Sequence, residues 1–205
     1  MRIALFGGSF DPPHRGHIAI ARAAADAFHL DRVLFAPAGR QPLKHDGHSA
    51  TYDQRFAMTG LACADSDPSR FFASRIDAPH QDGSANYTVD TLEALTLEYP
   101  GAKLFNLAGA DSFQHLAHWR SPLRLLQLAE WIVVSRPGIS LRLPESLSLT
   151  PPQQARIHLL DSVHEDVAAT NLRERLATGD PCADLLPPSV AAYIARHHLY
   201  AFPNN

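Results

Sequence analysis

The stretch Ile3-Ala4-Leu5-Phe6-Gly7-Gly8-Ser9-Phe10-Asp11-Pro12-Pro13-His14-Arg15-Gly16-His17 decides how the rest of the chain is interpreted. Residues 3–6 are apolar and favour a strand, and the two glycines that follow let the backbone turn and approach a ligand closely. Residues 14–17 then open an apolar segment, 18–28, that favours a helix. A strand, a glycine-rich turn and a helix N-terminus together predict a phosphate-binding site, because helix N–H groups and the helix dipole attract anions.

Composition limits the class of protein. The 205 residues fit a single domain, which we place at residues 1–205. Lys and Arg number 18 and Asp and Glu 21, for a net charge of −3, so a general nucleic-acid binder is disfavoured. No apolar run approaches membrane-spanning length, no signal-peptide pattern is present, and Cys63 and Cys182 form no Cys-x-x-Cys motif. We therefore expect a cytoplasmic protein with no nucleic-acid or membrane partner; the oligomeric state, including a homo-oligomer, stays open.

Strand-like and helix-like segments alternate along the chain. Strands are predicted at 3–6, 32–36, 71–76, 103–108, 131–134 and 157–160, and helices at 18–28, 51–63, 88–97, 112–128 with a break near 121–122, 171–177 and 189–197. Residues 139–156 predict loop and short pieces. The alternation predicts an α/β fold, a doubly wound, Rossmann-like parallel sheet with helices on both faces. Ligands bind at the carboxyl ends of such strands, which here are followed by loops rich in polar residues.

The opening motif resembles the signature of the His-x-Gly-His nucleotidyltransferase superfamily, whose members transfer a nucleotide monophosphate from a nucleoside triphosphate and release pyrophosphate. The glycine spacing of dinucleotide-binding Rossmann proteins is absent, which disfavours hydride transfer. Imidazoles at a helix N-terminus can donate to phosphate oxygens as charge builds there. The resemblance implies that His14 and His17 bind the triphosphate and that His17 stabilises the transition state. It also implies an ATP site along Gly7, Gly8, Ser9 and Phe10.

Later motifs are similar to those of the nicotinate mononucleotide adenylyltransferases. Lys44 matches a cation of that family, although Leu43 replaces a His. Residues 167–173 resemble an element in which hydroxyls and an arginine hold the outgoing phosphates. The resemblance thus implies catalytic roles for Lys44 and Arg173 beside the two histidines, and a hydroxyl from Thr170, whereas Ala168 replaces the usual Ser. The ATP-binding set that it implies also includes Gly109, Asp111 and Arg136.

Two further motifs resemble the acceptor site of that family. The first, residues 86–92, implies that Thr88 helps to recognise the nicotinate carboxylate, with Tyr87 nearby, and Lys44 is also expected to contact the acceptor. The second implies that Trp119 stacks on the pyridine ring, although many relatives have Tyr where Arg120 stands. Each residue has a plainer interpretation. Thr88 and Thr170 could be N-caps, Asp111 to Gln114 has capping-box spacing, and Trp119 could belong to the core.

Metal binding is weakly indicated. The pairs His45/His48 and His115/His118 have ligand-like spacing, and Asp111 shares a helical face with the second pair, but no Cys or Glu cluster completes a site. We predict no metal held by the protein alone. Mg²⁺ is expected to accompany ATP, as is usual for such transfers.

The resemblance runs from Gly7 to the closing segment 176–200. It implies adenylyl transfer from ATP to nicotinate mononucleotide, giving nicotinic acid adenine dinucleotide (deamido-NAD) and pyrophosphate in NAD biosynthesis, without a side-chain nucleophile. Alternative acceptors are nicotinamide mononucleotide and phosphopantetheine, and cytidylyl transfer is a further alternative; Thr88 and Trp119 argue against the last two. A non-catalytic nucleotide-binding module and a zinc-stabilised regulator are alternatives of a different class.

Overall fold

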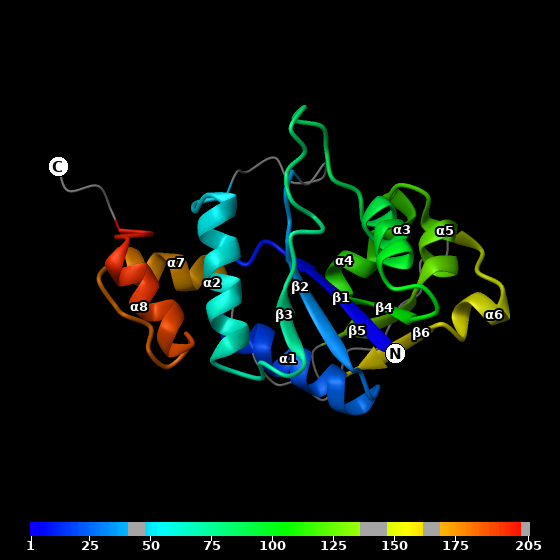
Figure 1. The fold of residues 1–205 in the computed structure, drawn as a ribbon, viewed down its shortest axis with the longest axis horizontal. Helices are drawn as coiled ribbons and strands as arrows, with labels where there is room; N and C mark the ends of the chain where they lie inside the picture. Colours follow the sequence, from blue (N-terminus) through cyan, green and yellow to red (C-terminus); the bar gives the residue numbers. More distant parts are fainter. Residues whose placement is uncertain (41–47, 136–146, 162–168, 202–205) are drawn as a thin grey trace.

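The computed structural model describes residues 1–40, 48–135, 147–161 and 169–201. Six parallel strands form one sheet in the order β3-β2-β1-β4-β5-β6 (Figure 1). The strands are β1 (Arg2–Gly8), β2 (Arg32–Pro37), β3 (Phe71–Ala73), β4 (Lys103–Gly109), β5 (Glu130–Val134) and β6 (Ile157–Leu160). The predicted doubly wound α/β fold is confirmed.

The alternating side chains of β1 supply both faces of the sheet, as the period of two in a strand requires. Ala4 and Phe6 pack in one buried cluster with α1 (Arg15–Ala27), α2 (Tyr52–Ala64), α7 (Ala169–Ala177) and α8 (Pro188–Arg196). Ile3 and Leu5 pack in the other with α3 (Thr88–Glu98), α4 (Ala110–Gln114) and α5 (Pro122–Leu128). Figure 1 shows α2, α7 and α8 on one side of the molecule and α3, α4 and α5 on the other.

The sheet order reverses direction at β1. The chain moves outward through β2 and β3, then returns to the other side of β1 with β4, so the loops after β1 and β4 diverge from adjacent strands. This switch point is where open parallel sheets bind ligands. β1 runs through Gly7 and Gly8 instead of ending before them, so the loop after β1 holds residues 9–14 of the Gly7–His17 motif. This loop occupies the position that the fold reserves for a ligand.

Local signals set several boundaries. The predicted capping box of α2 is confirmed: Gln54 N donates to Thr51 Oγ1 at 3.3 Å, and Thr51 N donates to Gln54 Oε1 at 2.9 Å. The capping-box interpretation of Asp111–Gln114 is wrong, because α4 begins at Ala110 with Gly109 as its N-cap.

Other boundaries differ from the sequence prediction. The predicted helix 112–128 is three pieces, α4, the 3₁₀ turn η1 (Leu116–His118) and α5, and β3 is shorter than predicted. The short helix α6 (Pro151–Gln154) falls within the predicted loop region. No helix in the described ranges is long and apolar enough to cross a membrane.

Candidate active site

Two imidazoles meet at the start of α1. His14 is the N-cap of the helix and His17 lies in its first turn, so their rings lie against each other, tilted by 32°, with centroids 3.7 Å apart. The backbone N–H of His14 donates to Nδ1 of His17 at 3.2 Å. Because Nδ1 accepts a hydrogen bond there, the neutral His17 ring carries its own hydrogen on Nε2. His17 is thereby prepared to donate a hydrogen bond from Nε2.

Aromatic packing and burial keep this pair neutral. The buried Phe10 ring lies edge-on to His17, with centroids 4.9 Å apart. Burial lowers the pKa of His14 to about 4, and burial together with the neighbouring His14 holds the pKa of His17 well below 6.5. In the described part of the chain, Nδ1 of His14 has no hydrogen-bond partner that would stabilise a charged ring. Both rings are therefore neutral at pH 7 in the absence of ligand.

Arg173 joins this loop from a distant helix. Its position on the first turns of α7 lets Nη1 donate to the backbone oxygen of Asp11 at 2.9 Å, while Nη2 donates to Thr170 Oγ1 at 3.3 Å. Thr170 is itself within α7, which begins at Ala169, so the N-cap interpretation of Thr170 is wrong. The structure thus places a guanidinium, which suits phosphate geometry, against the loop that leads into the two imidazoles.

A cavity of about 670 Å³ opens at the carboxyl ends of the central strands. Predicted site residues lining it come from the β1 turn, the start of α3 and the segment after η1. They are Gly7, Gly8, Ser9, Tyr87, Thr88 and Trp119. A smaller hollow of about 160 Å³ adds Gly109 and the ends of β2 and β4. The size and the mixed lining of the larger cavity are those of a small-molecule site.

The cavity combines an aromatic platform with donors for an anion. Trp119 is half-buried, with its ring edge-on to Trp131 at 5.6 Å, so it is neither a free surface group nor a core residue. Thr88 is the first residue of α3, after the N-cap Tyr87, which makes the N-cap interpretation of Thr88 wrong. Arg120 lies over the Tyr87 ring, with Cζ 4.6 Å from its centroid. Arg120 Nη1 is also 3.6 Å from Asp90 Oδ2, so part of its charge is already compensated. The helix start favours a negative group in this cavity.

Sequence reasoning missed an acidic residue in the cavity. Asp77 lines both hollows and accepts a hydrogen bond from Thr91 Oγ1 at 3.2 Å. Burial raises its pKa to about 6. Asn86 fixes the same segment, because its amide nitrogen donates to the carbonyls of Asp77 and Ala78 at 3.3 and 2.8 Å. No sequence pattern marks Asp77, which stands in an irregular loop after β3.

Arg55 is a second residue that sequence reasoning missed. Its guanidinium is 2% exposed and donates to the backbone oxygens of Ser9 and Ala38 at 2.7 and 2.8 Å. It thereby ties the loop after β1 to the end of β2. A signal did exist, since Arg55 occupies the buried stripe of α2 with Met58, Thr59 and Ala62 at helical spacing.

Comparison with known proteins shows the family of this chain. Residues 5–175 match the family described as cytidylyltransferase-like. A protein of a Roseiflexus species (strain RS-1) named "probable nicotinate-nucleotide adenylyltransferase" is 41% identical over 198 residues, which cover 97% of each chain. A protein of the same name from Solibacter usitatus is 39% identical over 202 residues, covering 98% of this chain and all of the relative. This chain belongs to the nicotinate-nucleotide adenylyltransferase family.

Solved structures show that the family fold is shared. The Plasmodium falciparum nicotinic acid mononucleotide adenylyltransferase complexed with NaAD superposes with a TM-score of 0.75 at 16% identity, covering 97% of each chain. The same enzyme complexed with APC gives a TM-score of 0.73 at 17% identity. At these identities the likeness establishes the adenylyltransferase fold alone.

The predicted site residues of this adenylyltransferase fall into two groups around the β1 loop. His14, His17, Thr170 and Arg173 gather on the side of α1 and α7, and the cavity residues lie toward α3 and η1. Asp111 is exposed and lines neither hollow. Lys44, Arg136 and Ala168 lie outside the described residues. Within the described ranges no three His, Cys, Asp or Glu residues gather as a metal site, and His115 and His118 have ring centroids 6.2 Å apart.

Proposed function

We propose that this chain, as one nucleotidyltransferase domain over residues 1–205, transfers the adenylyl group of ATP to nicotinate mononucleotide. The acceptor phosphate oxygen forms a bond to the α-phosphorus, the bond from that phosphorus to the bridging oxygen breaks, and pyrophosphate leaves with deamido-NAD as the other product. The observation that carries the proposal is a pair of sites at the loop after β1. The two imidazoles and the Arg173 guanidinium lie on one side, and the cavity with its aromatic side chain lies on the other.

The residues of the chain contribute position and charge in this reaction. His17 donates from Nε2 to an α-phosphate oxygen, and Arg173 binds the outgoing phosphates, with Lys44 as a further cation. Gly7 lines the cavity, and because it has no side chain a phosphate can approach its backbone closely. Fixed donors aimed at developing charge lower the barrier without a protein nucleophile.

We propose Mg²⁺ as the divalent ion of the reaction, bound with the triphosphate. The described residues hold no acidic or histidine cluster that could cage a metal alone, and Mg²⁺ characteristically takes most of its ligands from phosphates and water. When bound it neutralises phosphate charge. We also propose the cytoplasm as the compartment, in keeping with the free thiols of Cys63 and Cys182.

The acceptor cavity supports nicotinate over nicotinamide. Thr88 and Val89 begin α3, so their N–H groups have no partner inside the helix. Arg120 also lines the cavity, with Nη1 3.6 Å from Asp90 Oδ2. A carboxylate accepts from these donors more strongly than a carboxamide, because a hydrogen bond to a charged group contributes about 1.5–3 kcal/mol and a neutral one about 0.5–1.5 kcal/mol. We expect kcat/KM to be about 10- to 100-fold higher for nicotinate mononucleotide than for nicotinamide mononucleotide.

The test is pyrophosphate release with ATP and Mg²⁺, offering the two mononucleotides in parallel and identifying the dinucleotide by mass. Equal rates with both acceptors would support adenylyl transfer but contradict selection of the nicotinate carboxylate by the cavity. No release with either acceptor, in a protein that binds ATP, would favour the non-catalytic module.

ATP binding is expected to take up protons. The His14 and His17 rings are neutral at pH 7, and a triphosphate beside them raises their pKa values toward the ordinary 6.5. ATP affinity should therefore increase as the pH falls from 8 toward 5.5. Calorimetry in buffers of different ionisation enthalpy measures the proton uptake, and the double variant His14→Gln/His17→Asn should abolish it.

The same shifts set the sign of the stability change without ligand. The unfolded histidines bind protons below pH 6.5 while the folded ones do not until much lower pH, so stability is full above pH 6.5 and falls toward pH 4. In the calorimetric experiment with ATP, proton uptake that persists unchanged in the double variant would contradict the assignment of the protons to His14 and His17.

A further inference from the structure

Asp11 is the point where three distant segments meet the Gly7–His17 loop. Its side chain is 3% exposed, and Oδ2 accepts from the N–H of Ser49 at 2.7 Å. Oδ1 accepts from the N–H of Ala50 at 3.2 Å and from the hydroxyl of Tyr200 at 2.7 Å. Its backbone oxygen accepts from Arg173. One carboxylate thus connects the loop to the segment before α2 and to the C-terminal region, and the adjoining carbonyl connects it to α7.

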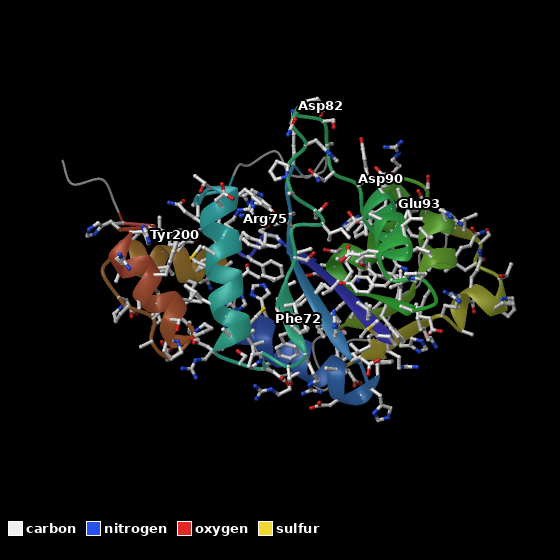
Figure 2. The ribbon with its side chains drawn as sticks, in the orientation of Figure 1. Phe72, Arg75, Asp82, Asp90, Glu93 and Tyr200 are labelled. Carbon is white, nitrogen blue, oxygen red and sulfur yellow. The ribbon has the colours of Figure 1, made fainter. Side chains whose placement is uncertain are left out.

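The chain after α8 is shaped to deliver the Tyr200 hydroxyl to this carboxylate. Leu199 N donates back to Ile194 O at 3.1 Å, and His198 and Tyr200 have φ values of 50° and 64°. Such angles are unfavourable for residues other than glycine and persist where surrounding contacts hold them. Figure 2 shows Tyr200 at the end of α8, on the side of the molecule where α2 lies. The phenol then reaches a partner 189 residues away in sequence.

The hydroxyl is a donor at any physiological pH. Burial and the negative charge of Asp11 raise the pKa of Tyr200. Because Asp11 is acceptor-only when ionised, three N–H and O–H donors saturate much of its capacity and fix its orientation. Removing one donor from a buried carboxylate leaves part of its charge uncompensated, which loosens the loop that it anchors.

We propose that Tyr200 is a positioning residue for the phosphate side of the adenylyl-transfer site. Its hydroxyl holds Asp11, and Asp11 holds the loop that carries His14 and His17 against Arg173. The inference rests on the proposed function for the role of those phosphate ligands. Tyr200 is not among the residues that line the acceptor cavity. Its substitution should therefore affect ATP and not the acceptor.

The test is Tyr200→Phe, which removes one oxygen and keeps the ring. We expect a roughly 10-fold or larger loss in kcat/KM for ATP, since hydrogen bonds to charged groups contribute about 1.5–3 kcal/mol. The KM for nicotinate mononucleotide should stay within about twofold, because Thr88 and Trp119 belong to other elements. A change in the KM for ATP without a change in the KM for nicotinate mononucleotide distinguishes positioning from a general loss of folded protein.

Tyr193→Phe is the matched control, since Tyr193 is on α8 and its ring packs on His197 with centroids 4.2 Å apart, whereas the hydrogen bonds to Asp11 come from other residues. It should leave both KM values unchanged. A cycle with Arg173→Lys should show that the two substitutions are not additive for ATP. Should Tyr200→Phe fail to fold, Asp11→Asn weakens the same bond from the acceptor side and serves for the same measurement.

ATP affinity by calorimetry makes the outcomes distinguishable. Wild-type protein that binds ATP but releases no pyrophosphate would overturn the proposed function, and the affinity of Tyr200→Phe for ATP would still test the present inference. A Tyr200→Phe protein with wild-type ATP affinity and kcat/KM, or with equal losses for ATP and for the acceptor, would overturn the positioning role.

Discussion

Replacing His17 with Asn is expected to lower kcat by about 10²–10³-fold, the usual cost of removing one fixed donor to developing charge. Asn places its amide oxygen near the position of Nδ1, where it can still accept from the N–H of His14. Asn lacks any group at the position of Nε2, the atom from which His17 is proposed to donate to the α-phosphate. The helix start should therefore stay intact while the chemistry is lost.

His17→Gln is the matched comparison, because its longer side chain reaches toward the Nε2 position and can supply an N–H there. Steady-state pyrophosphate release, together with thermal unfolding, separates the effects. We expect Gln to retain more activity than Asn at similar stability. Equal activity of His17→Asn and wild type would remove His17 from the chemistry, and a large loss of stability in both variants would assign the ring to packing against Phe10 instead.

Replacing Arg173 with Ala is expected to lower kcat/KM for ATP by about 10³-fold, the lower end of what an arginine contributes to phosphoryl transfer. The guanidinium has two donors already aimed by Asp11 and Thr170, which orients its remaining N–H groups. Loss of this group removes the charge that receives the departing pyrophosphate.

Arg173→Lys tests geometry apart from charge. A lysine keeps the charge and cannot bind phosphate in the bidentate manner, so its activity should fall between those of wild type and Ala. The KM for the mononucleotide, measured at saturating ATP, should change little in either variant. A proportional rise of both KM values would indicate that Arg173 holds the fold through Asp11 rather than binding phosphate.

Most of the fold followed from local patterns in the sequence. β1 and α1 were predictable because the apolar run and the helical spacing act within a few residues, although the strand continues through the two glycines that were expected to end it. Thr51 with Gln54 marks the start of α2 in the same way. The start of α4 was not predictable, since its N-cap is Gly109 and not Asp111, the polar residue that the capping-box pattern indicates. Strand order and the pairing of β1 with β4 depend on contacts about 100 residues apart, for which alternation gives only the fold class.

The candidate site was predictable to the extent that motifs carry it. His14, His17, Thr88 and Trp119 stand in recognisable runs, and the structure brings them to the expected edge of the sheet. The supporting groups could not be found in this way. Tyr200 reaches Asp11, and Arg55 reaches Ser9, across the chain, and no local pattern encodes such a hydrogen bond. Asp77 acquires its raised pKa only from burial in the folded protein.

The central claim is direct transfer of the adenylyl group, with position and charge supplied by the protein and no covalent intermediate. The most direct measurement is the configuration at phosphorus in the dinucleotide formed from one diastereomer of the α-thio analogue of ATP. A single in-line displacement inverts that configuration, and inversion is the result that the account predicts. Retention would require two displacements, and thus an adenylylated side chain, which would contradict it.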